Sequence, residues 1–237
     1  ALQTAPATSL KQFPAVLRML SWNVMKFDLP GSREQLNRLA AHTDLLLLQE
    51  SLRSADTPKT GGSYRYFSPG YARGSEQTGV EVRSGEPADV VCELRFVEPW
   101  LRTPKASLAI RLPFRDAALL LINLHAINFT LTTYDYASQL SELAQLVNSH
   151  PGPVIIAGDF NHWNTWRAAK LQRWAEDLSL TEVTFALDWR SRHLGARVDT
   201  IFLRGLSVIA EAALPTTRSD HHPITASLEL LKNSEVP

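Results

Sequence analysis

The spacing of apolar and polar positions divides the chain into short strands and longer helices. Short apolar runs between turn signals are typical of buried strands. They predict strands at residues 18–22, 45–50, 154–157, 197–203 and 224–230. Apolar residues that repeat every three or four positions predict helices at about residues 32–41, 133–150 and 165–178. Ser32 and Gln35 have the spacing of a capping box at the start of the first helix.

Two further regions complete the expected fold. Residues 51–79 are rich in Gly, Ser, Thr and Pro, which predicts a compact loop with one strand at most. Residues 79–124 contain short apolar runs without helical spacing, which predicts an antiparallel meander. Alternating helices and strands, together with this meander, predict an α/β fold. We expect a four-layer αββα sandwich, in which two packed mixed sheets lie between outer helices.

Composition favours one domain without a strong electrostatic field. The chain has 237 residues, 44% of them hydrophobic, so it can bury a large core. We expect an N-terminal tail at residues 1–17, a single domain at residues 18–237, and a monomer. Lys and Arg together number 24, as do Asp and Glu. Because no global positive field attracts a polyanion, a local patch would have to recognise one.

Cysteine content and the chain start bear on location. Cys92 is the only cysteine, which excludes an internal disulfide and leans toward a reducing, cytoplasmic compartment while leaving the question open. No apolar run approaches the ~20 residues of a membrane span, so we expect no transmembrane segment. Residues 1–8 begin with Ala1 and lack a signal pattern. We therefore expect that an upstream segment was removed by processing.

Polar residues gather where the predicted strands end. The set comprises Asn23, Glu50, His125, Asn128, Asp159, Asn161, Asp199, Asp220 and His221. Open α/β sheets bind ligands at such strand ends, and buried acids need a partner or a metal to offset desolvation. Carboxylate and amide oxygens without cysteine favour Mg²⁺ or Mn²⁺ over structural zinc. The sequence therefore predicts a divalent-metal site.

Six short motifs in order carry a family resemblance. They are SWN at 21–23, LLQE at 47–50, NLHAIN at 123–128, GDFN at 158–161, RVDTIF at 197–202 and SDHHP at 219–223. GDFN alone would be an ordinary match, whereas the ordered set is highly specific. From about residue 18 to residue 230 the chain resembles the endonuclease/exonuclease/phosphatase superfamily, which is DNase I-like and exonuclease III-like, and above all its uncharacterised bacterial members. The resemblance implies an αββα sandwich that cleaves a phosphoester with a divalent metal.

The resemblance also implies which residues hold the metal. Glu50 lies at the principal metal-ligand position, with Asn23 beside it. Asp220 lies at a position that can serve a second or alternative metal site. Mg²⁺ or Mn²⁺ held there would neutralise charge that develops on a phosphate oxygen.

The same resemblance implies the catalytic residues. Asp159 matches the residue that orients or deprotonates the attacking water, and Asn161 matches its neighbour on the scissile phosphate. His221 matches the catalytic histidine and Asp199 the acid that holds it. An aspartate against one ring nitrogen fixes the tautomer and raises the pKa of the histidine, so an imidazolium can face the phosphate.

Two more positions connect this chain to particular branches. His125 takes a catalytic and phosphate-contacting position that is histidine in DNase I-like members and tyrosine in the AP endonucleases. Asn128 lies where the AP endonucleases place a phosphate-contacting asparagine. The missing tyrosine weakens the case for abasic-site specificity. The Ser-Arg pair common in the superfamily is reversed here as Arg83-Ser84, which puts that contact in doubt.

Some neighbours of the motifs allow two interpretations. Glu81 could support His125 or face solvent, and His222 could assist His221 or be a bystander. The run at residues 189–197 could bind phosphate or be a solvated loop. A substrate groove or ordinary packing could explain His162, Trp163 and Trp166.

The substrate class has one first expectation and two alternatives. We expect a metal-dependent phosphodiesterase that acts on nucleic acid as an endo- or exonuclease. A sphingomyelinase-like enzyme acting on phospholipid, or an inositol-phosphate phosphoesterase, is the main alternative, and a non-catalytic binding module is the third. A basic rim at residues 190–197 would favour nucleic acid, whereas an exposed apolar loop at residues 127–136 would favour lipid.

Overall fold

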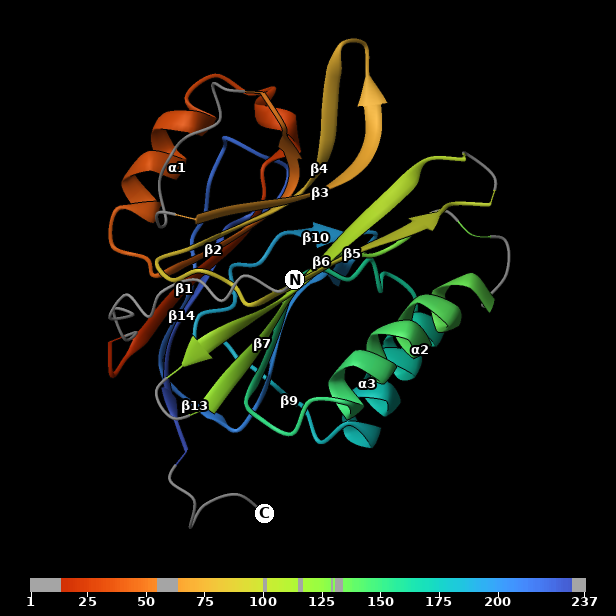
Figure 1. Ribbon diagram of the computed structural model, residues 1–237. Coiled ribbons are helices and arrows are strands. Elements are labelled where there is room, and N and C mark those ends of the chain that lie inside the picture. The colour runs from red at the N-terminus through yellow and green to blue at the C-terminus, as the bar shows by residue number, and fades with distance from the viewer. Residues whose placement is uncertain are drawn as a thin grey trace, which may run out of the picture.

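Two six-stranded sheets pack face to face, with α1 outside one sheet and α2 and α3 outside the other (Figure 1). The computed structural model describes residues 14–54, 64–99, 102–114, 117–128, 130 and 134–231. The helices are α1 (Ser32–Ala40), α2 (Tyr134–Asn148), α3 (Thr165–Asp177) and the short 3-10 turn η1 (Met25–Phe27). None of the helices in these residues is long and apolar enough to cross a membrane. The predicted αββα sandwich is confirmed.

Each sheet combines strands that lie far apart in the sequence. The first sheet has the order β13-β14-β1-β2-β4-β3 and the second β5-β6-β7-β8-β12-β9. The first sheet contains β1 (Leu17–Asn23), β2 (Leu45–Leu52), β3 (Tyr64–Arg73), β4 (Glu76–Ser84), β13 (Leu206–Ala213) and β14 (Ile224–Leu230). The second contains β5 (Val90–Val97), β6 (Pro104–Phe114), β7 (Ala117–His125), β8 (Val154–Asp159), β9 (Thr181–Glu182) and β12 (Asp199–Arg204). A separate hairpin joins β10 (Arg192–His193) to β11 (Ala196–Arg197).

Three apolar clusters hold the layers together. The largest lies between the sheets and includes Leu47 and Leu121. A second packs α2 and α3 on the second sheet through side chains such as Tyr136 and Trp174. The third packs α1 on the first sheet through Leu36. Removal of these side chains from water, at roughly 25 cal/mol per Å² of apolar surface, is the main force that holds the four layers.

Parallel strand pairs near the middle of each sheet bring the polar strand ends to one edge. β1 pairs with β2 in parallel, which places Asn23 opposite Gln49. β7 pairs with β8 in parallel, which places His125 opposite Asp159. The antiparallel strand β12 then begins with Asp199 opposite Asp159. The edge that collects these residues is the candidate site.

Three details differ from the sequence expectations. Residues 64–84 form a hairpin of two long strands, β3 and β4, that extends from the body (Figure 1), whereas residues 55–63 lie outside the described part. Strand β4 pairs with β2 in the first sheet, and residues 85–89 then carry the chain to the second sheet. The predicted meander therefore contains only β5 to β7. Gly31, with φ 79°, is the N-cap of α1, so Ser32 lies inside the helix and the predicted capping box is wrong.

Candidate active site

Polar residues from both sheets meet at this edge. Asn23 ends β1 in the first sheet, whereas Asp159 ends β8 and Asp199 begins β12 in the second. Asn23 Nδ2 donates to Asp159 Oδ2 at 3.3 Å, a hydrogen bond between residues 136 positions apart. The two sheets therefore share one cluster of side chains.

Glu50 lies at an irregularity of β2. The register between β2 and β4 shifts between Leu48 and Ser51, and Glu50 has φ 52°. A bulge of this kind bends the strand and changes the direction of a side chain. The Glu50 carboxylate consequently lies near the site, with Oε1 3.9 Å from Nε2 of His125.

An unusual turn places Lys26 against the same carboxylate. Met25, Lys26 and Phe27 have φ values of 44°, 59° and 60°, a region that successive non-glycine residues rarely occupy. Lys26 Nζ contacts Glu50 Oε2. Burial by itself lowers the pKa of Lys26, but Glu50 outweighs it and raises the pKa above its ordinary value. Strain in such a turn persists where the surrounding structure maintains it, and it is common at functional sites.

His221 lies between two carboxylates. Its Nδ1 is 2.7 Å from Asp199 Oδ2, and its Nε2 is 3.8 Å from Asp159 Oδ2. Burial by itself lowers the pKa of His221, but Asp199 and Asp159 outweigh burial and raise it to about 10. His221 is therefore an imidazolium at neutral pH, with a proton on each ring nitrogen, and Nδ1 donates to Asp199.

Asp159 is a buried carboxylate with a shifted pKa. Burial raises the pKa of Asp159 to about 6, even though the positive charge of His221 acts to lower it. The backbone N–H of Asn161 donates to Asp159 Oδ1 at 3.1 Å. A base whose pKa lies near neutral pH is suited to accept a proton from water. This environment is compatible with the role that the family resemblance implies for Asp159.

His125 is neutral and lies next to a second lysine. Its Nε2 is 2.8 Å from Lys105 Nζ and 3.6 Å from Asp159 Oδ2. Burial, and then the charge of Lys105, holds the pKa of His125 well below its ordinary value. The neutral ring can therefore accept a hydrogen bond from Lys105 through Nε2. With Lys26, the site contains two ammonium groups.

Sequence reasoning missed both lysines. Lys26 follows Asn23 by three positions, and Lys105 precedes the apolar run of β6. Neither lies in a strand-end cluster of polar residues. The nearest sequence signal is the position of each cation close to the end of a predicted strand.

The two amides expected to contact phosphate lie on the α3 side of the site. Asn161 has φ 48°, and its Nδ2 donates to the carbonyl oxygen of Ala126 at 2.9 Å. Asn128 Oδ1 accepts a hydrogen bond from Trp163 Nε1 at 2.8 Å. Trp163, which was open between groove and packing, therefore holds a candidate site residue. Their contact with phosphate stays a prediction.

Arg167 organises the loops that carry these amides. Its buried guanidinium donates to the carbonyl oxygens of Ile127, Asn128 and Asn161, each at 2.8 Å. It also lies over the Trp163 ring, 5.2 Å from the centroid. Multiple donors in a fixed planar fork allow one arginine to set several loop positions. A surface position would have been the ordinary expectation for this helical arginine.

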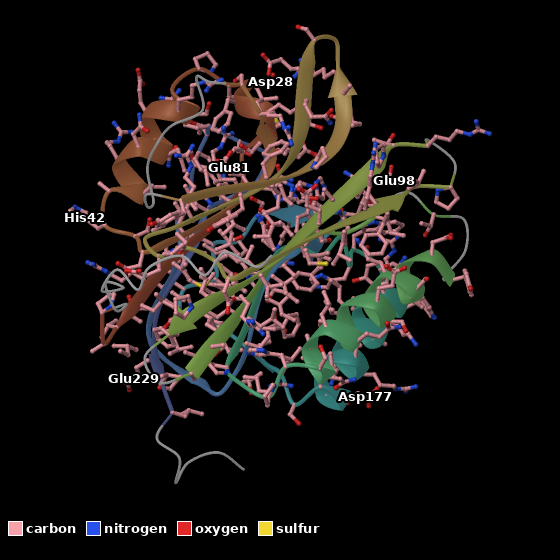
Figure 2. All side chains as sticks on the ribbon, in the orientation of Figure 1. Asp28, His42, Glu81, Glu98, Asp177 and Glu229 are labelled. Carbon is pink, nitrogen blue, oxygen red and sulfur yellow. The ribbon has the colours of Figure 1, made fainter. Side chains whose placement is uncertain are left out.

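Glu81 is a buried structural residue, contrary to the solvent-facing interpretation. It lies in the packed interior (Figure 2) and is fully buried. Its carboxylate accepts from Ser51 Oγ at 2.8 Å, from Arg65 at 2.9 Å and from Arg83 at 2.5 Å. Glu81 therefore neutralises two arginines instead of supporting His125. The charge of Arg83 is used in this pair.

The run at residues 189–197 is neither a free phosphate-binding loop nor fully solvated. Arg190 and Arg197 both lie 2.8 Å from the Asp188 carboxylate. His222 binds the backbone of this run through its ring Nδ1 and the Trp189 carbonyl oxygen, which supports the bystander interpretation.

An exposed apolar loop at residues 127–136 would favour lipid, but this loop is buried at both of its ends. Ile127 and Tyr136 are 1% and 0% exposed, whereas Tyr134 is 76% exposed. Residues 129 and 131–133 lie outside the described residues. Trp166 is 38% exposed and makes an edge contact with Tyr136, so it partly packs.

The oxygen donors at the strand ends fit a divalent cation. Glu50 has a carboxylate with a partly exposed side chain, and Asn23 Oδ1 lies at the adjacent strand end. Hard oxygen donors of this kind suit Mg²⁺ or Mn²⁺. The Lys26 ammonium contacts the same carboxylate, so a divalent cation would have to share Glu50 with it or displace it. Asp220 is exposed and groups instead with His193 and His221, with donor atoms within 4.8 Å of one another.

Sequence comparison gives this site a family context. The sequence model of the endonuclease/exonuclease/phosphatase family matches residues 20–221. A UPF0294 protein of Yersinia pestis is 37% identical over 218 residues, covering 90% of this chain and 84% of the relative. A UPF0294 protein of Klebsiella pneumoniae is 36% identical over 213 residues, covering 88% and 80%.

Solved structures share the fold at low identity. An endonuclease/exonuclease/phosphatase from Beutenbergia cavernae has a TM-score of 0.73 at 17% identity, covering 92% of this chain and 72% of that one. The mannosyl-6-phosphatase of Bacteroides thetaiotaomicron has a TM-score of 0.66 at 15% identity, covering 90% and 99%. The residues that the family model matches include all six sequence motifs except the last two positions of SDHHP. The chain therefore belongs to the endonuclease/exonuclease/phosphatase family, a superfamily of phosphoesterases.

Proposed function

We propose that the protein is a divalent-metal-dependent phosphodiesterase. The observation that carries the proposal is the position of the His221 imidazolium between Asp199 and Asp159. His221 can act as an acid and Asp159 as a base, because their pKa values are well separated. The pair lies in a cluster that also holds oxygen donors of the kind that bind metals, and this combination suits hydrolysis of a phosphoester. The fold alone does not determine which kind of phosphoester is cleaved, because a structural neighbour is a mannosyl-6-phosphatase.

The residues divide the reaction between them. Asp159 accepts a proton from the attacking water, and His221 donates to a phosphate oxygen, or to the leaving oxygen, while Asp199 fixes its ring. Lys105, held by His125, adds positive charge beside the phosphate. A divalent cation held by Glu50 and Asn23 would supply charge neutralisation on a phosphate oxygen.

Two variants test this assignment. Asp159→Asn and His221→Ala should keep the fold and lose about 10²- to 10⁴-fold in metal-dependent hydrolysis, because each removes one proton-transfer group. Turnover of bis-p-nitrophenyl phosphate, p-nitrophenyl phosphate, plasmid DNA and RNA with Mg²⁺ or Mn²⁺ gives the measurement. Nucleic acid remains the substrate class expected from the sequence.

Matched controls come from exposed positions. Asp177→Asn and His42→Ala change the same residue types at the periphery of the molecule (Figure 2). Both should keep the activity of the unmodified protein. Near-full activity of Asp159→Asn at equal metal loading would remove the mechanism.

A further inference from the structure

The loop at residues 186–198, here named the rim loop, borders the proposed catalytic histidine. The His193 ring stacks on the His221 ring, with centroids 4.2 Å apart and 25° between the planes. The carbonyl oxygen of Trp189 accepts a hydrogen bond from the His222 ring. Whatever surface the rim loop binds is therefore brought next to His221.

The rim loop exposes three large apolar side chains. Leu187, Trp189 and Leu194 are 72%, 57% and 79% exposed. Leu194 lies between β10 and β11, where the chain turns, and has φ 50°. Single exposed apolar residues are ordinary, but three between positions 187 and 194, at the border of a site, are typical of an interaction surface.

The rim loop uses two of its cations internally. Arg190 donates to the Asp199 carbonyl oxygen at 2.9 Å and to the Asp188 carboxylate at 2.8 Å, and its side chain is only 10% exposed. Arg197 lies 2.8 Å from the same carboxylate. These pairs fix the loop and leave little positive charge for a polyanion. Arg192 is exposed, and its guanidinium donates to the carbonyl oxygen of Gly195 in the same hairpin at 2.8 Å.

We propose that the rim loop docks on a phospholipid surface and presents headgroup phosphodiesters to the Asp159–His221 pair. Leucine side chains transfer favourably into the acyl region, and tryptophan prefers the membrane–water interface. Arg192 complements the negative phosphate of a headgroup. A nucleic-acid surface would instead need several unpaired cations along its path.

This inference rests on the proposed function and gives it a substrate class. Water attacks the phosphorus of the headgroup and loses a proton to Asp159. One P–O ester bond breaks, and the leaving oxygen takes a proton from His221. The products are an alcohol and a phosphomonoester.

The test compares vesicle binding with turnover. The full chain is mixed with vesicles of equimolar phosphatidylcholine and phosphatidylglycerol, or of phosphatidylcholine alone, and bound protein is measured by sedimentation. The rim variant combines Leu187→Ser, Trp189→Ser and Leu194→Asn, the last because asparagine tolerates a positive φ. We expect it to lose about 10-fold or more in vesicle binding, since each apolar side chain contributes to partition. The ratio of phospholipid to bis-p-nitrophenyl phosphate turnover should fall equally.

The control variant removes apolar surface elsewhere. Val90→Ser, Val91→Ser and Ile209→Ser change side chains that are 44%, 45% and 49% exposed outside the rim loop. This control should bind vesicles like the unmodified protein. Equal vesicle binding and an equal turnover ratio for the rim variant would overturn the inference, as would an unmodified protein that binds no vesicles and cleaves only nucleic acid. Vesicle binding that depends on the rim, without hydrolysis of any phosphodiester, would support the surface and overturn the proposed function.

Discussion

Two charged residues at the site act through their immediate neighbours, Lys26 through Glu50 and His221 through its two aspartates. An ammonium next to a metal-type carboxylate repels a divalent cation, by roughly 4 kcal/mol per unit charge at 4 Å for an effective dielectric constant near 20. The same ammonium can attract a substrate phosphate. At the proposed metal site, Lys26 would therefore balance metal affinity against anion binding.

Replacing Lys26 by methionine should tighten metal binding. Lys26→Met removes the charge and keeps the side-chain length, so the Kd for Mn²⁺ should fall about 10-fold or more, measured by electron paramagnetic resonance of free Mn²⁺. Lys26→Arg keeps the charge and should leave the Kd near that of the unmodified protein. A weaker Kd for Lys26→Met would mean that the lysine helps to form the metal site.

His221 should make stability depend on alkaline pH. Its folded pKa of about 10 lies above the ordinary value of 6.5. Its contribution is therefore fully present below about pH 6.5 and is lost as pH rises toward 10. With metal removed by a chelator, Tm between about pH 7 and about pH 9.5 should fall by at least about 5 °C more in the unmodified protein than in His221→Gln. Parallel Tm curves for the two proteins would refute this linkage.

At the scale of elements, the site depends on how closely β7 and β8 approach. Gly158 has φ 145°, and a Cβ atom there would lie 2.0 Å from the carbonyl oxygen of Leu124. The parallel pairing of Leu124 with Gly158 is the step before His125 meets Asp159. Only glycine allows this approach without moving one strand.

Substituting Gly158 by alanine should therefore destabilise the protein strongly. We expect Gly158→Ala to cost about 3 kcal/mol or more, because the clash with backbone adds to the strain of its φ. Urea unfolding gives the measurement. Gly85→Ala is the matched control, since a Cβ atom there meets nothing within 4 Å. Similar midpoints for the two variants would show that β8 shifts at little cost.

At the scale of the whole molecule, a buried polar bridge joins the two sheets. Asn123 in β7 donates to the carbonyl oxygens of Leu48 and Glu81, both at 2.9 Å, and accepts from Gln49 at 2.7 Å. Buried polar groups are costly unless paired, so this bridge specifies how one sheet lies on the other. The site inherits that alignment, because its residues come from both sheets.

Loss of the bridge should weaken both stability and the site. Asn123→Leu should cost about 2–4 kcal/mol, because the Gln49 amide and two carbonyl oxygens lose a partner. Urea unfolding measures the loss, and Asn37→Leu at an exposed helical position of α1 is the control. An unchanged unfolding free energy for Asn123→Leu would mean that apolar packing alone aligns the sheets.

The sequence by itself determined the two-sheet fold and the strand ends at which Asn23, Asp159 and Asp199 occur. The spacing of apolar residues indicates which positions of one strand are buried. A short motif indicates residues that the neighbouring backbone holds in place. Only tertiary structure decided the β3–β4 hairpin, the buried role of Glu81, and the contacts of Lys26 and Lys105. It also decided that Asp188 neutralises Arg190 and Arg197. These depend on side chains that approach from other strands and loops, which no local pattern records.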